Sequence, residues 1–394
     1  MINSVIGPVE VGPVAHGGHC VARHDGRVVF TRHALPGEQV MIRITDTSHE
    51  RYWSGDAVEI LQPAPERVEA PCRFSGPGLC GGCDFQHVEL SHQRELKRRV
   101  VAEQLTRLAG FDWSGVVEEV PHPMVANGGG WRTRMQWHAD ESGRWGLRAH
   151  HSHRVIAVDD CHIAADGLPE ISGTGQQAVT VLAAHGETAL LVDGELRTHT
   201  GAVHDQLQRT ITQEAHGRSY AVADDGFWQV HPAAAEILVA AVLDGLAPQA
   251  GERALDLYCG VGLFAGALHD RGVRVHGVEG GRRAVELARR NVPGARFTVG
   301  RVERTMRTLA KRADLVVLDP PRKGAGRAVM REVLARRPRA IAYVACDPAA
   351  LARDLRTATD AGWQVSELRA FDLFPMTHHV ECVAVLTRAD AETR

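Results

Sequence analysis

Strand-length apolar runs alternate with helical stretches across residues 226–394, and this alternation limits the possible folds more than any other feature of the chain. It predicts a mostly parallel sheet with helices on both faces, because a parallel crossover needs a connection about as long as a helix. In such a sheet, ligands bind in a crevice at the carboxyl ends of the strands. The predicted strands are RALDLYC, RVHGVEG, ARFTVG, DLVVLDPP, AIAYVAC, WQVSELRAFDLF and HVECVAVLTR.

The residues before this segment have a different pattern, and with 394 residues the chain is long enough for two or three domains. Residues 1–61 alternate apolar and polar side chains between turn signals, which predicts a small OB-like β-barrel of a kind that often binds oligonucleotides. Residues 62–225 begin with a proline-marked linker (62–72), and we expect a small α+β central domain there. It contains a cysteine-rich loop, the helix SHQRELKRRVVAEQLTRLAG and several strands. Residues 226–394 form the third predicted domain.

Charge and hydropathy exclude some classes of protein. The formal net charge is −3, which excludes a histone-like polycation but allows local basic surfaces. No apolar run approaches the roughly 18 residues of a membrane span. The first residues, MINSVIGPVEVGP, lack the basic and apolar regions of a secretory signal. We therefore expect a cytoplasmic protein without a membrane partner, and a monomer.

The first strand of the α/β domain leads into Asp256-Leu257-Tyr258-Cys259-Gly260-Val261-Gly262. Glycines at this turn let the backbone approach a ligand, although Gly-x-Gly alone is a weak signal. Glu279 ends the second strand about 20 residues later, where a carboxylate can accept hydrogen bonds from ribose hydroxyls. The pair favours a nucleoside-containing cofactor over a solvated glutamate in a turn. Asp319, followed by two prolines, is expected at the edge of the same crevice.

Cys346 ends the fifth predicted strand and should reach this crevice. A cysteine is often a buried small hydrophobe, as we expect for Cys259 and Cys382. At a strand end in a crevice it can instead be a nucleophile. A thiolate that adds to C6 of uracil makes C5 reactive enough to take a methyl group from S-adenosylmethionine. A base must then remove the C5 proton, and Glu381 on the last strand is suitable if the fold brings it near Cys346.

These residues resemble the RNA 5-methyluridine methyltransferases, which act on ribosomal or transfer RNA. The most specific matches are Phe227-Trp228-Gln229, Asp319-Pro320-Pro321-Arg322, Cys346-Asp347-Pro348 and His379-Val380-Glu381, in the order of the family. The resemblance covers nearly the whole chain. It implies an N-terminal TRAM barrel, a central iron–sulfur domain and a Rossmann-like class I methyltransferase domain.

The same resemblance implies roles for individual residues. Cys346 would be the nucleophile and Glu381 the proton acceptor. This chain differs from the family at two positions: Asp347 stands in place of an asparagine after the nucleophile, and Leu263 in place of an asparagine that contacts the cofactor. The residues that would bind S-adenosylmethionine are Gln229, Tyr258, Glu279 and Asp319.

Four cysteines suggest a metal site. Cys72, Cys80 and Cys83 fall in one glycine-rich loop, and Cys161 lies further along the chain. The Cys-x2-Cys spacing can bring two sulfurs to one metal, but the spacing leaves both tetrahedral zinc and an iron–sulfur cluster open. The family resemblance implies a 4Fe-4S cluster. It also favours the branch that methylates 23S ribosomal RNA, because the transfer-RNA branch often lacks these cysteines.

RNA contacts are expected on the hairpin around residues 131–148, where tryptophans and arginines are interleaved. The sequence leaves open whether these tryptophans stack on bases or belong to the core. Three alternatives to a ribosomal RNA enzyme remain. They are a transfer-RNA uridine-5 methyltransferase, a non-catalytic iron–sulfur RNA-binding protein and a zinc-bearing methyltransferase for another nucleobase.

Overall fold

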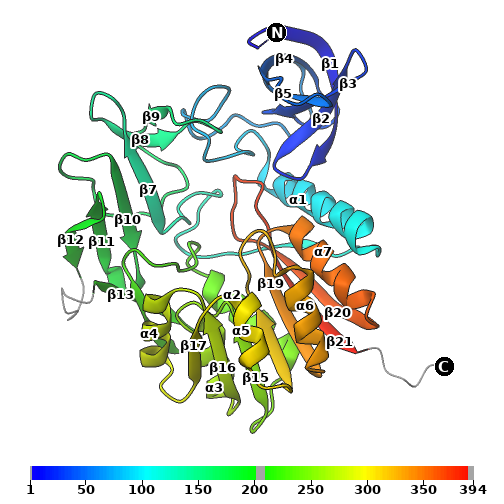
Figure 1. Cartoon of the computed structure of the whole chain (residues 1–394). Helices are drawn as coiled ribbons and strands as arrows, with labels where there is room; N and C mark the ends of the chain where they lie inside the picture. The colour runs from blue at the N-terminus through cyan, green and yellow to red at the C-terminus, as the bar shows by residue number, and fades with distance from the viewer. Residues whose placement is uncertain (1, 201–208, 389–394) are drawn as a thin grey trace.

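The computed structural model describes residues 2–200 and 209–388, so the predicted domain limits at residues 1 and 394 lie outside it. The N-terminal part is a closed barrel in the order β1-β2-β3-β5-β4 (Figure 1). This arrangement confirms the predicted OB-like barrel. Its strands are β1 (Val5–Ala15), β2 (His19–His24), β3 (Arg27–Arg32), β4 (Gln39–Asp46) and β5 (Tyr52–Gln62).

The C-terminal part contains an eight-stranded sheet in the order β17-β16-β15-β18-β19-β21-β20-β6. All seven predicted strands are present. The four pairings from β17 to β19 and the pairing of β20 with the edge strand β6 are parallel, which confirms the mostly parallel sheet. The strands are β15 (Arg253–Leu257), β16 (Arg274–Glu279), β17 (Arg296–Val299), β18 (Leu315–Leu318), β19 (Ala340–Ala345), β20 (Trp363–Asp372), β21 (Glu381–Arg388) and β6 (Val117–Glu119).

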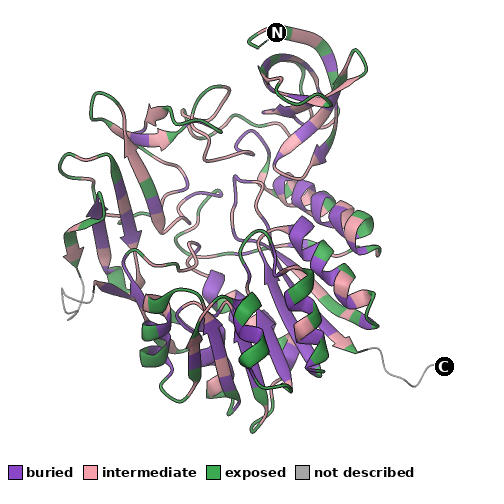
Figure 2. Cartoon of the chain, viewed as in Figure 1, coloured by how far each residue is buried: buried purple, intermediate pink, exposed green. Residues whose placement is uncertain are grey.

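Helices cover both faces of this sheet, and its central strands are almost wholly buried (Figure 2). One face packs against α2 (Ala234–Leu246), α3 (Leu263–Asp270) and α4 (Arg282–Asn291). The other face packs against α5 (Val302–Thr305), the short helix η3 (Met306–Thr308), α6 (Gly326–Ala335) and α7 (Pro348–Thr359). The two apolar cores leave the carboxyl ends of the parallel strands uncovered, where the crevice was predicted.

Strand β21 lies antiparallel between β19 and β20. Ala345 at the end of β19 pairs with Cys382 near the start of β21. Because antiparallel neighbours run in opposite directions, the residue after β19 and the residue that begins β21 meet at the same edge of the sheet. Those residues are Cys346 and Glu381.

The central part forms a six-stranded antiparallel sheet and a separate hairpin, next to the large sheet (Figure 1). The six-stranded sheet has the order β12-β11-β10-β7-β8-β9, with a short helix η2 (Ala184–Gly186) between β10 and β11. Its strands are β7 (Arg134–Ala139), β8 (Trp145–Arg148), β9 (Val155–Ala157), β10 (Gln177–Leu182), β11 (Thr188–Val192) and β12 (Glu195–Thr200); the hairpin is β13 (Thr210–Ala215) and β14 (Arg218–Ala223).

The predicted linker helix is α1 (Leu90–Gln104), extended by η1 (Leu105–Ala109) and ended by Gly110 in a left-handed conformation. It has two apolar faces. Leu96 and Val100 pack into the barrel core, whereas Val101 and Leu105 pack into the core of the large sheet. The helix therefore fixes the barrel against the C-terminal part. No helix in the described residues is long and apolar enough to cross a membrane.

Candidate active site

The six residues predicted for catalysis and cofactor binding line one cleft at the carboxyl edge of the large sheet. The cleft measures about 1390 Å³, more than the roughly 300–1,000 Å³ of a typical small-molecule site. It therefore has room for a nucleoside cofactor and for a second ligand such as a nucleobase. The six residues are Gln229, Tyr258, Glu279, Asp319, Cys346 and Glu381.

The turn after β15 shapes one wall of the cleft. Tyr258 has a φ of 65°, a left-handed conformation that is uncommon for a residue with a side chain, and Gly262 has a φ of 93°. Glu279 ends β16 beside this turn and accepts hydrogen bonds from the backbone N–H groups of Gly260 (3.3 Å) and Gly281 (2.7 Å). These bonds hold the Glu279 carboxylate at the cleft wall, where further lone pairs can accept bonds from a ligand.

The sequence prediction did not include Asp256, a buried carboxyl group under the same turn. One oxygen accepts a hydrogen bond from the backbone N–H of Ala265 at 2.8 Å, near the start of α3, and the other has no partner in the described residues. Burial raises the pKa of Asp256 to about 8. Its position in an apolar strand gave no signal of its own, because the sequence does not show that the residue faces the turn.

Leu263, the second difference from the family pattern, is buried in the core of α3. Its side chain cannot supply the polar contact that an asparagine would make. Phe227, Arg322 and His379 also line the cleft; they belong to the motifs that carry the family resemblance, but no role was predicted for them. Among them, Phe227 is 73% exposed at the cleft, and Arg322 and His379 lie within hydrogen-bond distance at 3.2 Å.

The surroundings of Cys346 and Glu381 favour the protonated form of both side chains. Burial, and then the nearby charge of Glu381, raises the pKa of the Cys346 thiol to about 12. Burial, and then the charge of Asp319, raises the pKa of Glu381 well above its usual range. Arg322 opposes both shifts with its positive charge. Such perturbed groups in one cleft are typical of a catalytic site.

Asp347, which follows the cysteine, is the N-cap of α7. One of its oxygens accepts a hydrogen bond from the backbone N–H of Ala350 at 2.7 Å, and the other lies 3.1 Å from Nε2 of His16. His16 belongs to the loop between β1 and β2 of the barrel. The carboxylate is thus directed at the helix and the barrel. Among the groups that raise the pKa of Cys346, Asp347 contributes least.

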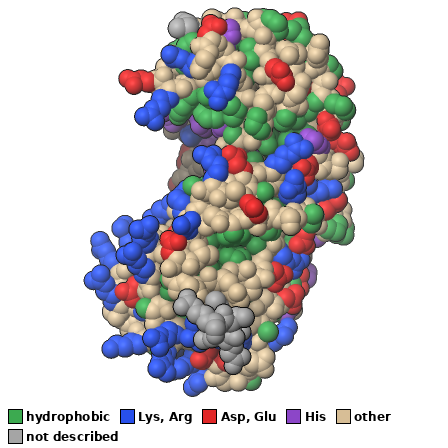
Figure 3. Space-filling model, turned by 90° about the vertical axis from the view of Figure 1, so that its right-hand side faces the viewer, with side chains coloured by type: hydrophobic (Ala, Val, Ile, Leu, Met, Phe, Trp, Pro, Cys, Tyr) green, Lys and Arg blue, Asp and Glu red, His purple; other side chains and the backbone are tan. Residues whose placement is uncertain are grey.

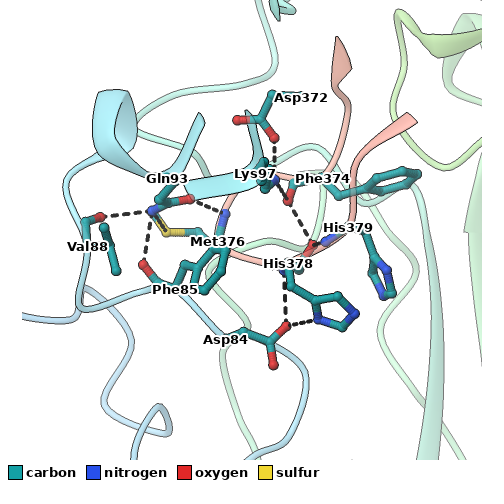
Figure 4. Close-up of polar contacts among 11 residues, drawn as sticks. Asp84, Phe85, Val88, Gln93, Lys97, Asp372, Phe374, Met376, His378 and His379 are labelled. Carbon is teal, nitrogen blue, oxygen red and sulfur yellow. Dashed lines mark hydrogen bonds and ion pairs between the residues drawn. The ribbon is translucent and has the colours of Figure 1, made fainter. Parts of the chain in front are cut away.

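Residues 373–380, the loop that leads into β21, are held by side chains from elsewhere in the chain (Figure 4). The side chain of Gln93 accepts a hydrogen bond from the backbone N–H of Met376 at 2.8 Å. Asp84 accepts one from the backbone N–H of His378 at 3.1 Å and contacts Nδ1 of the same residue at 2.6 Å. Helix α1 and the cysteine-rich loop therefore both fix the approach to the site.

Lys97 of α1 is fully buried and binds the other side of this loop. Its Nζ donates to Asp372 at 2.6 Å and to the backbone oxygen of Phe374 at 3.0 Å.

We expect Lys97→Met to lower the free energy of unfolding by about 3–5 kcal/mol, because the Asp372 carboxylate would stay buried without a counter-charge. Urea denaturation measures the change. The neighbouring Arg98→Met, which breaks only a surface pair with Glu95, should cost less than about 1 kcal/mol. Equal losses would contradict this interpretation.

The four predicted metal ligands, Cys72, Cys80, Cys83 and Cys161, line one small pocket together with both apolar and polar residues. None of them is in a disulfide, and the backbone N–H of Gly82 donates to the sulfur of Cys80 at 3.4 Å. The donor set therefore suits a thiolate-bound group. However, no three His, Cys, Asp or Glu side chains within residues 2–200 and 209–388 are arranged to hold a metal ion.

Of the tryptophans in the 131–148 hairpin, Trp131 is buried, and Trp137 and Trp145 are half-buried. Trp131 is buried and packs in a small cluster with Ile163 and Met376. Trp137 and Trp145 pack against a second cluster in the six-stranded sheet. None of the three is placed as an exposed stacking platform.

Comparisons with known proteins agree with this arrangement. Family models match residues 6–58 (TRAM domain), 233–342 (methyltransferase small domain) and 305–389 (tRNA (uracil-5-)-methyltransferase). An uncharacterised RNA methyltransferase of Streptomyces avermitilis is 48% identical over 97% of this chain and 98% of its own length. The chain belongs to the RNA uracil-5-methyltransferase family.

Further similarities extend over the full length of this methyltransferase. An uncharacterised RNA methyltransferase of Bifidobacterium longum is 36% identical over 96% of each chain. The crystal structure of Pyrococcus abyssi tRNA (uracil-54, C5)-methyltransferase in complex with S-adenosyl-L-homocysteine has a TM-score of 0.73. It is 23% identical and covers 96% of this chain and 99% of its own, which shows the same fold. The protein is an S-adenosylmethionine-dependent RNA methyltransferase.

Proposed function

We propose that this enzyme methylates C5 of uridine in 23S ribosomal RNA, with Cys346 as the nucleophile and Glu381 as the proton acceptor. The observation that carries the proposal is the meeting of these two residues at the ends of adjacent antiparallel strands, inside one cleft. A nucleophile alone could serve several reactions. A buried carboxyl group beside it supplies what C5 substitution also needs, a group that takes the C5 proton.

The reaction follows from the chemistry of the two side chains. The thiolate of Cys346 bonds to C6 of uracil, and the electron pair of the C5–C6 double bond forms an enolate over C5, C4 and the C4 oxygen. C5 then takes the methyl group, which S-adenosylmethionine supplies. Glu381 removes the remaining C5 proton, the C6–S bond breaks, and the double bond and the thiolate are restored. The uridine must leave its stack to reach the cleft, and the volume of the cleft allows this.

Four residues are proposed to hold the cofactor: Gln229, Tyr258, Glu279 and Asp319. Glu279 is fixed at the end of the second strand, where a carboxylate can accept bonds from ribose hydroxyls. Burial raises the pKa of Asp319 to about 7. A cationic sulfonium group bound in the cleft favours the ionised forms of nearby carboxyl groups. Cofactor binding would thus prepare Glu381 to act as a base.

Because the thiol of Cys346 is protonated at neutral pH, we expect the rate of adduct formation with RNA to depend on pH. Because the pKa of Cys346 is about 12, the thiolate fraction grows about tenfold per pH unit below that value. We expect the single-turnover rate of RNA adduct formation to rise between about pH 7 and 9. Asp347→Asn should move the profile to lower pH, since asparagine keeps the helix cap but removes a negative charge. A flat profile for both proteins would mean that RNA binding, not thiol ionisation, limits the rate.

Two observations bear on which RNA is modified. The four cysteines around one pocket favour ribosomal RNA, by resemblance to members that carry such a set. The likeness to the tRNA (uracil-54, C5)-methyltransferase of P. abyssi makes transfer RNA the second candidate. We propose ribosomal RNA, and one experiment can compare the two.

The test uses the enzyme, S-adenosylmethionine and RNA that contains 5-fluorouridine. Fluorine at C5 cannot leave as a cation, so the reaction should stop at a covalent complex that survives a denaturing gel. We expect this complex with 23S ribosomal RNA and not with transfer RNA. A complex with transfer RNA alone would show that transfer RNA, and not ribosomal RNA, is the substrate. No complex with either RNA, from protein that binds the cofactor, would overturn the uridine mechanism.

We further propose that Cys72, Cys80, Cys83 and Cys161 bind a 4Fe-4S cluster. A single zinc ion needs its sulfurs about 2.3 Å from one point, whereas a cluster binds each thiolate through a different iron. The four thiols line one pocket, and the resemblance to the family favours the cluster over zinc. Such a cluster would tie the loop of residues 72–83 to the segment around Cys161, and no step of methyl transfer depends on it.

Anaerobically purified protein should contain iron and acid-labile sulfide, about four of each per chain. Cys80→Ser/Cys83→Ser should lose both, together with visible absorption, and should melt at least about 5 °C lower, because the bound group stabilises only the folded state. Cys20→Ser, which changes a cysteine in the barrel core, should keep its iron. Stoichiometric zinc in place of iron would overturn the cluster assignment.

We also propose that the enzyme acts in the cytoplasm as a monomer. Its cysteines are all free thiols, which suits a reducing compartment. Light scattering after size-exclusion chromatography should give the mass of one chain, and a dimer mass would contradict the monomer.

A further inference from the structure

Positive charge is concentrated on the outer side of α5, η3 and α6. Residues 301–331 contain nine Lys and Arg against three Asp and Glu, in a chain whose net charge is −3. Of the three acids, Asp314 pairs with Arg253 and Asp319 belongs to the catalytic cleft. We call the exposed cations of these elements the cationic face: Arg301, Arg304, Arg307, Lys323, Arg327 and Arg331.

The cationic face is one continuous surface. Helix α6 lies against both α5 and η3, and α5 and α6 lie at the front in Figure 1. Arg301, Arg304 and Arg307 follow each other at intervals of three residues, from the N-cap of α5 into η3. Arg327 and Arg331 are four residues apart on α6, so they lie on one side of that helix. Figure 3 shows Lys and Arg side chains gathered along the corresponding edge, below the hollow that separates the barrel from the rest.

None of these six side chains forms a hydrogen bond or an ion pair with another residue that the structure describes. The arginines of the 131–148 hairpin differ in this respect. Arg134 donates to the backbone oxygen of Asp224, Arg132 to that of Arg134, and Arg144 pairs with Asp140. The cations that sequence alone suggested for RNA are thus largely used within the protein, whereas those of the cationic face are available.

The cationic face begins at the active site. Arg301, Arg304 and Lys323 line the mouth of the catalytic cleft, and Arg307, Arg327 and Arg331 continue away from it. When one nucleotide of an RNA enters the cleft, the rest of the RNA chain must continue away from the cleft along the protein surface. Arginine forks match phosphate oxygens in geometry and stay charged at any physiological pH.

We propose that the cationic face binds the RNA backbone on one side of the target nucleotide, opposite the part of the RNA that reaches the barrel. This inference rests on the proposed RNA substrate. The face would hold phosphates without reading bases, so that it fixes the path of the RNA and leaves sequence choice to the cleft and the barrel. It would also make binding depend on salt, because each neutralised phosphate releases counterions.

The test compares Arg307→Gln/Arg327→Gln with the matched control Arg271→Gln/Arg388→Gln. The first pair lies on the cationic face but outside the cleft. The control pair is exposed at the opposite, amino edge of the parallel strands. The dissociation constant for a ribosomal RNA fragment is measured without cofactor over a range of salt concentrations. Calorimetry with S-adenosylmethionine and a melting curve check that each variant is folded and keeps its cleft.

We expect roughly tenfold weaker RNA binding for the variant of the cationic face at about 0.1 M salt. The slope of log K against log salt should fall by about 1.4 in magnitude, as for two lost contacts with single-stranded RNA. The control should match the native enzyme. If both double variants bind RNA as the native enzyme does, the inference is wrong, although the enzyme can still methylate RNA. If the native enzyme binds RNA in this salt-dependent way but methylates none, the proposed function fails and the cationic face remains supported.

Discussion

Cys346→Ala is expected to reduce methyl transfer to RNA by at least about 10⁴-fold, while the affinities for cofactor and RNA stay close to those of the native enzyme. Uracil C5 is a poor nucleophile until a group has added to C6, and no other thiol lines the catalytic cleft among the described residues. Alanine fits the end of β19, and Asp347 can still cap α7. The loss should therefore be chemical. Single-turnover assays with labelled cofactor and calorimetry with each ligand measure the two quantities.

Two variants control this experiment. Cys20→Ala changes a buried thiol in the barrel, far from the cleft, and should keep the native rate. Cys346→Ser keeps the size of the side chain but offers a far less acidic and weaker nucleophile, so it should be nearly as inactive as Cys346→Ala. Residual methylation within about tenfold of native in Cys346→Ala would show that C6 is attacked by another group, and the mechanism would have to be replaced.

The sequence was a good guide to elements that are defined by local pattern. The apolar runs that end in Asp319 and Cys346 are buried strands, and the turn signals of residues 1–61 mark a closed barrel. Apolar periodicity and the turn preferences of Gly and Pro depend on neighbours in the chain, so they are visible without a structure. The same holds for Cys259 and Cys382, which are buried as expected.

Relationships between distant segments could not be predicted in the same way. Nothing in the sequence states that β21 enters between β19 and β20, yet this order brings Glu381 beside Cys346. The contact between His16 and Asp347 joins residues 331 positions apart. Helix α1 showed one apolar repeat in the sequence, but Leu96 and Leu105 belong to two different cores. Strand order and domain packing depend on contacts between residues that are far apart in the chain, and a short sequence pattern does not show these contacts.

Glu381→Gln is expected to stop the enzyme after methyl transfer, with the RNA still bonded to Cys346. Glutamine has nearly the shape of glutamate but cannot accept the C5 proton, so the C6–S bond has no route to break. Multiple-turnover methylation should fall by about 10³-fold. A labelled methyl group should appear in a protein–RNA complex on a denaturing gel, with natural uridine and without fluorine.

Glu381→Gln should also change the first half of the reaction, in which Cys346 bonds to the RNA. This half should become faster, although release of the RNA becomes slower. Glu381 is the charged side chain that raises the pKa of Cys346 most. When the bound cofactor keeps Glu381 ionised, its replacement by a neutral amide favours the thiolate and should speed adduct formation at neutral pH. Fast formation with slow release is a signature that a merely misfolded variant cannot give. Glu381→Gln/Cys346→Ala should show no complex, and Glu367→Gln, which changes an exposed carboxylate on β20, should turn over normally. Normal turnover by Glu381→Gln itself would assign the proton to another acceptor in the cleft.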